Sequence, residues 1–172
     1  MTSDRPRAGE RIVRAALIIL CMAAYIPSMP VNRFEITDAG GTLYASPVPN
    51  GASFVTRYIH SVQLTPVVDD YRFANGRIWG WEERVQSNNA GLPSIPPERG
   101  RFIMASPWMI VRGGGESHSV IVHRVGSAEF GLNTWRLLPF GEIRAFERHP
   151  YARVRFSCSI AKLKDSPVVG FE

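Results

Sequence analysis

The sequence has little cysteine and almost no lysine. Its two cysteines are Cys21, which lies in an apolar run near the N-terminus, and Cys158, far along the chain. They cannot form a disulfide within one domain, and they cannot supply the cysteine pairs of a zinc ribbon. Only Lys162 and Lys164 among the 20 basic residues are lysines, so arginine carries most of the positive charge. This bias is more typical of genome composition than of a particular partner.

Motifs of several enzyme and cofactor-binding classes are also missing. No serine lies in a G-x-S-x-G elbow, and the glycines at 113–115 are followed by Glu116, which would repel a phosphate. His118 and His123 are an odd interval apart, which places them on opposite faces of one strand and disfavours a shared metal site. Nucleic-acid binding requires a basic stripe within a known module. We therefore expect no cofactor, no metal site and no nucleic-acid partner.

The N-terminal segment has the pattern of a membrane anchor. Four arginines occur in the first 14 residues, and residues 15–26 carry no charged side chain. Extended to residues 12–31, the segment is long enough to cross about 30 Å of hydrocarbon as a helix. Pro27 and Pro30 are expected to end it. The preceding arginines place the N-terminus in the cytoplasm by the positive-inside bias.

Three interpretations of this segment remain open: an uncleaved signal anchor, a cleaved signal peptide and a core helix of a soluble protein. The signal anchor is favoured, because the positions available for cleavage are poor. We therefore expect residues 1–31 to form a basic cytoplasmic tail and a single-pass anchor in the inner (cytoplasmic) membrane. Residues 32–172 would form one domain outside the cytoplasm, in the periplasm.

From residue 32 onward, short apolar runs alternate with turn residues, and no stretch keeps a period of 3.6. Asn75-Gly76 is a strong hairpin signal, because both central positions of a type I′ turn have positive φ. So many short strands predict an all-β fold, either an antiparallel sandwich or a partly open barrel. The expected strands are 33–37, 42–46, 53–62, 67–74, 77–85, 101–105, 108–112, 119–125, 134–138, 143–148 and 152–160.

The segment from 58 to 71 gathers polar groups around a proline-bearing turn. If its two strands pair, His60 and Asp69 can approach each other across the hairpin, and the carboxylate would hold one imidazole tautomer. Ser61 points to the opposite face of a strand from His60, so adjacency alone does not make a nucleophile and base pair. The simpler alternative is a hydrogen-bonded His60 and solvated aspartates.

A polar, proline-rich loop spans residues 86–98. Its candidate binding residues are Ser87, Asn88, Gly91, Leu92 and Pro93. Gly91 can adopt positive φ and Pro93 fixes its own φ, so the loop can be rigid. Loops carry function more often than scaffolds do, although a plain connection with Leu92 at the edge of the core explains the pattern equally well.

These two segments resemble an uncharacterised family of small bacterial exported proteins, catalogued as domain of unknown function eighteen-fifty. The resemblance rests on Tyr58, the His60-Ser61-Val62 triplet, Pro66-Val67, Asp69 and the run Ala90-Gly91-Leu92-Pro93. It covers about residues 50–100. Members of the family are often encoded beside TAXI-type TRAP transporters, so the resemblance implies an accessory role in solute uptake.

The predicted function is therefore a membrane-anchored binding domain that assists such a transporter, with a TRAP-type permease or solute receptor as partner. An enzyme is disfavoured; the alternatives are a small envelope hydrolase using His60 and Asp69, or a passive envelope domain. Trp79 and Trp81 share one strand face with Glu83, where they could pack in the core or line a partner groove. The hairpin from His60 to Asp69 and the loop at 88–93 are expected to lie side by side, because three consecutive antiparallel strands bring them to one end.

Overall fold

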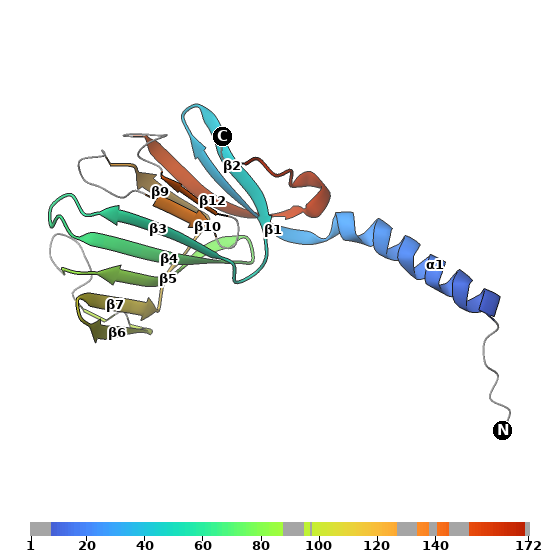
Figure 1. Ribbon diagram of the computed structural model, residues 1–172, viewed down its shortest axis with the longest axis horizontal. Coiled ribbons are helices and arrows are strands. Elements are labelled where there is room, and N and C mark those ends of the chain that lie inside the picture. The colour runs from blue at the N-terminus through green and yellow to red at the C-terminus, as the bar shows by residue number, and fades with distance from the viewer. Residues whose placement is uncertain are drawn as a thin grey trace, which may run out of the picture.

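The computed structural model shows two antiparallel β-sheets packed face to face, with one helix projecting from them (Figure 1). It describes residues 8–87, 95–96, 98–126, 134–137, 141–144 and 152–170. The expected sandwich is confirmed, and the strands within the described residues do not close into a barrel. The elements are α1 (Ala8–Tyr25), η1 (Ile26–Ser28), β1 (Pro30–Asp38), β2 (Gly41–Val48), β3 (Ser53–Ile59), β4 (Pro66–Ala74), β5 (Arg77–Val85), β6 (Gly100–Ala105), β7 (Trp108–Gly113), β8 (Ser117–His118), β9 (Val120–Arg124), β10 (Thr134–Leu137), β11 (Gly141–Arg144), β12 (Arg153–Lys162) and η3 (Leu163–Asp165).

The smaller sheet has the order β2-β1-β12-β9, and the larger has the order β11-β10-β3-β4-β5-β7-β6, with β8 added to one side of β5. Strands β3, β4 and β5 are consecutive in both sequence and space, as expected. Asn75 and Gly76 connect β4 to β5 and have φ angles of 52° and 70°. Both values are positive, which confirms the predicted type I′ geometry.

Helix α1 and η1 form an apolar stretch, Gly9–Ser28, of 20 residues, long enough to cross a membrane. None of this stretch is buried against the β-sandwich. The apolar stretch therefore begins and ends three residues earlier than the expected span at residues 12–31. The expected end was too late because Pro30 and Val31 already belong to β1 and pair with β12. Figure 1 shows α1 leaving the end of the sandwich at which β1 begins. We call this end the base and the opposite one the distal end.

The strand expectations are confirmed for most of the described residues, with two corrections; residue 138 and residues 145–148 of the expected strands lie outside the described part of the chain. The strand expected at 53–62 ends at Ile59, because the chain turns at His60. The two-residue β8 was not predicted, since a pair of residues is too short to show a period.

Aromatic rings fill the half of the inter-sheet space that lies nearer the base. Phe34 of β1 is completely buried, and its ring centroid lies 4.8 Å from that of Phe54 and 4.7 Å from that of Phe73. Phe156 of β12 meets Phe54 and Trp135 edge to face. Because these rings come from both sheets, their burial holds the sandwich together.

Candidate functional site

The turn after β3 is built around the His60 imidazole. Its Nδ1 accepts hydrogen bonds from the backbone N–H groups of Val62 and Gln63, both at 3.3 Å. The His60 N–H donates to the Thr65 carbonyl, and its own carbonyl accepts from Leu64. A side chain that accepts hydrogen bonds from the backbone N–H groups of a turn favours the turn over a longer strand. This explains why β3 ends at Ile59, the residue before His60. Ser61 lies exposed in the same turn.

The end of β5 returns to this turn, as expected from three antiparallel strands. Val85 pairs with Val67, and the Ser87 hydroxyl donates to the Gln63 side-chain oxygen at 3.0 Å. Ser87, the residue just before the loop at 88–93, therefore contacts this turn, and the position of the loop beside the hairpin stays a prediction because the loop lies outside the described residues. The other expected loop residues lie outside the described part of the chain: Asn88, Gly91, Leu92 and Pro93.

Asp69 does not join His60, and that expectation is wrong. In the β3–β4 register Asp69 lies opposite Thr56, and Ile59 lies opposite Pro66. The four residues from Thr56 to His60 correspond to about 13 Å along a strand. Thr56 donates to Asp69 Oδ2 at 3.2 Å instead. The pairing of His60 with Asp69 required for the hydrolase alternative is therefore absent.

Asp69 belongs to a polar cluster between the sheets, on the distal side of the aromatic rings. Glu83 of β5 lies directly opposite it in the strand register. Burial raises the pKa of Asp69 to about 6, although hydrogen bonds from Thr56 and Tyr71 act in the other direction. Burial and the neighbouring Asp69 charge raise the pKa of Glu83 to about 7. Two carboxyl groups with raised pKa values on facing positions can hold a proton near neutrality.

Two tyrosines flank these carboxyl groups, and a histidine of the smaller sheet packs against one of them. The Tyr71 hydroxyl donates to Asp69 Oδ2 at 3.4 Å. Burial and the charges of Asp69 and Glu83 raise the pKa of Tyr58 well above its ordinary value. The smaller sheet contributes His123 of β9, whose ring meets Tyr58 edge to face at 5.5 Å and stacks on Phe156. The sequence placed Tyr58, Asp69 and Tyr71 in one hairpin segment but did not connect them to Glu83 or His123, which come from a third strand and from the other sheet.

A β-bulge in β5 separates Glu83 from the tryptophans that were expected to share its face. Glu82 pairs with Asp70 and Gly80 pairs with Tyr71, so Trp81 is an extra residue without a partner position on β4. Beyond the bulge the alternation of side chains is reversed. Glu83 therefore points between the sheets, whereas Trp79 and Trp81 remain 40% and 48% exposed.

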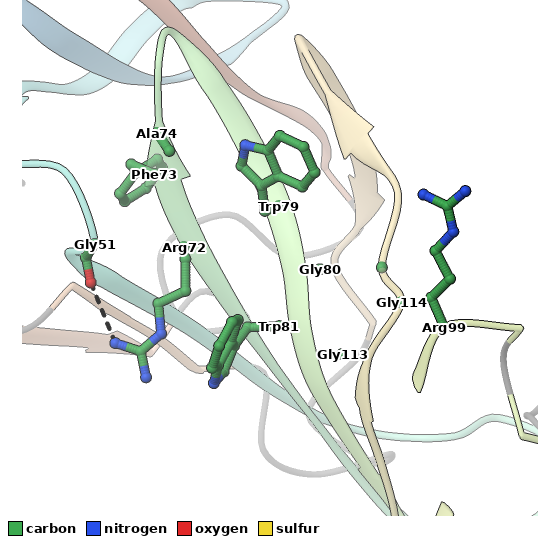
Figure 2. Close-up of a pocket in the computed structure, with 11 residues that line it drawn as sticks. Gly51, Arg72, Phe73, Ala74, Trp79, Gly80, Trp81, Arg99, Gly113 and Gly114 are labelled. Carbon is green, nitrogen blue, oxygen red and sulfur yellow. Dashed lines mark hydrogen bonds between the residues drawn. The ribbon is translucent and has the colours of Figure 1, made fainter. Parts of the chain in front are cut away.

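Trp79 and Trp81 line a cleft of about 750 Å³ on the surface of the larger sheet. Figure 2 shows both rings with Arg72 on one side and Arg99 on the other. The Arg72 guanidinium lies 5.9 Å from the Trp81 ring centroid, in cation–π geometry, and donates to the Gly51 carbonyl and to Asp70. These contacts fix the Arg72 side chain beside the indole ring.

Glycines form the far wall of the cleft because the backbones approach very closely there. A Cβ on Gly115 would lie 1.8 Å from the Gly80 carbonyl oxygen, and one on Gly114 would lie 2.8 Å from the Gly100 nitrogen. Both distances are shorter than any side chain tolerates. The glycines at 113–115 carry the chain from β7 past β5 to β8.

A second hollow lies beside the cleft and includes strand positions of the polar cluster in its lining. It has a volume of about 190 Å³, shares Gly80, Trp81 and the three glycines with the cleft, and is also lined by Asp69 and Glu83. An aromatic surface with two cations thus lies next to a pair of carboxyl groups. Such a surface can bind an apolar or aromatic ligand by stacking and can attract a negative group on that ligand. Among the described residues, no three His, Cys, Asp or Glu side chains gather to hold a metal ion.

Residues 54–137 match the family described as Domain of unknown function (DUF1850). This match confirms the resemblance found in the sequence. The DUF1850 segment begins in β3 and ends in β10, so it contains the polar cluster residues of the larger sheet, His123 and most of the cleft. No curated protein and no solved structure matches the chain.

Proposed function

We propose that this chain is a membrane-anchored, extracytoplasmic binding domain that assists a TAXI-type TRAP solute transporter. The observation that carries the proposal is the cleft at Trp79 and Trp81. Two large apolar side chains exposed side by side, within a cleft of about 750 Å³, are typical of a binding site and not of a core. The helix α1 supports the anchor, since it is long and apolar enough to cross a bilayer.

The ligand that suits this cleft has an aromatic or apolar body and a negative group. The indole rings of Trp79 and Trp81 supply stacking area, and most of the cleft lining is apolar. Arg99 supplies a cation on the side opposite Arg72. Arg72 is already paired with Asp70, so Arg99 is the residue that would meet the negative group of the ligand.

The binding role is tested with benzoate and its uncharged counterpart benzamide, by saturation-transfer NMR on the full chain in detergent micelles. We expect Trp81→Ala to abolish the transfer signal of both compounds, and Arg99→Ala to weaken only that of benzoate. Arg101→Ala is the matched control, because Arg101 is an exposed arginine of β6 that does not line the cleft. Binding of both compounds that survives in the double variant Trp79→Ala/Trp81→Ala would rule out the cleft as the site.

The transporter link rests on the family resemblance and has its own test. A tagged full-length chain, solubilised from its native membranes under conditions that preserve known membrane complexes, is expected to retain a TRAP-type permease or solute receptor. Trp79→Ala/Trp81→Ala distinguishes a partner held at the cleft from one held elsewhere. Failure to capture either component under those conditions would remove the transporter from the proposal and leave the binding domain.

A further inference from the structure

The base of the sandwich is a rigid platform organised by one buried side chain. The Asn32 amide nitrogen donates to Asn50 Oδ1 at 2.8 Å, and its oxygen accepts from the Gly76 N–H at 2.8 Å. The Asn75 N–H also donates to Asn50 Oδ1. Asn32 is only 3% exposed, so these bonds are protected from water. The β2–β3 turn, the β4–β5 turn and the start of β1 are thereby fixed to one another.

The outer surface of this platform is apolar in its middle. Ile160 lies opposite Asn32 in the β1–β12 register, just beyond the last layer of the core, and is 56% exposed. Met29, where the chain enters from the helix, is 40% exposed. A shallow hollow of about 240 Å³ lies beside them, lined by Pro30, Val48 and Ile160 among others.

Two cations flank this apolar surface. Lys162 pairs with Pro30 in the strand register, and Lys164 lies in η3, the short helical turn that follows. The Leu163 N–H donates to the Met29 carbonyl at 3.0 Å, which fastens η3 to the end of the helical segment. Figure 1 shows this turn, in red, beside the point where α1 meets the sandwich. Asp165 is the acidic residue within the same turn.

The position of the base relative to a bilayer follows from chain length. The apolar stretch ends at Ser28, and Pro30 is already in β1. Two residues span at most about 7 Å. The head-group layer is about 5–8 Å thick on each side of the hydrocarbon core. A helix that crosses the bilayer therefore brings the base into contact with the head groups.

We propose that the base, formed by Met29, Ile160, Lys162 and Lys164, docks on anionic lipid head groups and holds the domain in one orientation on the membrane. This inference rests on the proposed retention of α1 as an anchor. The lysines meet lipid phosphates, while Ile160 and Met29 enter the interface. One consequence is that Trp79, two residues from the start of β5, lies about 10 Å or less above the base along the strand. The cleft would then open close to the membrane surface.

The test uses the full chain in nanodiscs, with Cys21→Ser and Asp165→Cys so that an environment-sensitive dye reports on η3. We expect a blue shift of the dye in phosphatidylcholine discs that contain phosphatidylglycerol, and none in phosphatidylcholine alone. Each lysine near an anionic surface is worth about fivefold in the docking equilibrium. Lys162→Glu/Lys164→Glu should therefore reduce the docked-to-undocked ratio at least 25-fold, about fivefold for each lysine.

Arg153→Glu/Arg155→Glu is the matched control, because it makes the same charge change on exposed residues at the distal end of β12. This control should keep the blue shift. Equal emission in neutral and anionic discs, or equal loss in the two double variants, would overturn the docking proposal while the anchor stands. Absence of the chain from the discs, with a mature N-terminus beyond residue 25, would overturn the anchor and the docking together.

Discussion

The two halves of the space between the sheets are filled in opposite ways. Toward the base, Phe34, Phe54, Phe73 and Phe156 pack ring against ring. Toward the distal end, the same strands present carboxyl, hydroxyl and imidazole groups around Asp69. The first half supplies burial of apolar surface, which stabilises the fold at any pH. The second half contains groups whose protonation changes near neutrality, so its contribution to stability depends on pH.

A similar contrast exists between the neighbouring residues Glu82 and Glu83. Glu82 lies on the outer face of the larger sheet, where Arg84 and Arg112 donate to its two oxygens. Burial opposes ionisation of Glu82, but the two arginines outweigh it and lower its pKa. Glu83 faces Asp69 instead, and its pKa is raised. Of these two adjacent residues, Glu82 therefore forms ion pairs with arginines, whereas the Glu83 carboxyl group can take up a proton.

The largest expected effect is the loss of a ring from the aromatic half. Phe34→Ala should lower the free energy of unfolding by about 3–5 kcal/mol, because it removes a fully buried ring that contacts both sheets. Chemical denaturation of the full chain in micelles measures this change. Val122→Ala, at a 50% exposed position on β9, is the control and should cost less than about 1 kcal/mol. A similar small loss for Phe34→Ala would contradict the assignment of the core.

The second prediction concerns the polar half and has a definite sign. The folded-state pKa values of Asp69 and Glu83 lie above their ordinary values of 3.8 and 4.5. The folded state therefore binds protons more tightly, and its stability is greatest below about pH 4 and falls as the pH rises through 6 and 7. We expect a total loss of about 3 kcal/mol, allowing for solvent screening.

Asp69→Asn/Glu83→Gln is the variant that tests the origin of this slope. It removes both titrating groups but keeps their size, so the unfolding free energy measured between pH 4 and 8 should lose most of its decline. The same decline in the double variant would mean that other groups cause it. Phe34→Ala provides the contrast, since it should lower the whole curve without changing its slope.

A third prediction returns to the aromatic half through Cys158, whose pKa is raised to about 11 by burial. The thiolate is the reactive form, and a shift of two units from the ordinary value of 9.0 lowers its population about 100-fold. Labelling of native Cys158 by a water-soluble thiol reagent, in a Cys21→Ser background, should be slower than labelling of unfolded chain by at least that factor. Comparable rates would show that this part of the core opens readily.

The smallest expected effect is that of Thr56→Val. The Thr56 hydroxyl donates to Asp69 and lowers its pKa, so removal of the hydroxyl should raise the Asp69 pKa above about 6. Carboxyl NMR titration can resolve a rise of about half a unit, which corresponds to less than 1 kcal/mol. Thr37→Val on β1 is the control outside the cluster. An unchanged Asp69 pKa would remove Thr56 from the cluster.

The strands were predictable because alternation and turn chemistry act locally. Asn75 and Gly76 specify their own positive φ angles, so the β4–β5 hairpin follows from two residues. The sandwich follows in turn, since many short half-apolar strands must cover one another. The apolar N-terminal helix was also predictable, but its C-terminal boundary was not, because Pro30 and Val31 are apolar enough to belong either to this helix or to a strand.

The site could not be predicted to the same degree, because it depends on register. The sequence allowed Asp69 and His60 to pair across the hairpin. In the structure the His60 side chain instead accepts hydrogen bonds from backbone groups of the turn, and Thr56 lies opposite Asp69. The alternation of a regular strand places the side chains of Glu83 and Trp81 on the same face. They lie on opposite faces only because of the bulge. His123 comes from the other sheet, 65 residues after Tyr58 in the chain, and no local pattern connects the two.

Because of the bulge in β5, the core and the cleft both require the exact number of residues in this strand. Strand residues before Trp81 and after it follow opposite alternation, so Ile78 is buried while Trp79 is exposed, and Val85 and Glu83 point inward. Deletion of one residue at the bulge would restore a uniform alternation along β5. In one half of the strand, the side chains that now face the core would then face solvent, and the reverse. Ile78 would then face solvent and Trp79 would face Phe73, or Glu83 would leave Asp69. A substitution of Trp79 or Trp81 would change the cleft and leave this alternation intact, whereas deletion of the residue at Trp81 would bring outward-facing side chains of β5 into the core or move core side chains out of it.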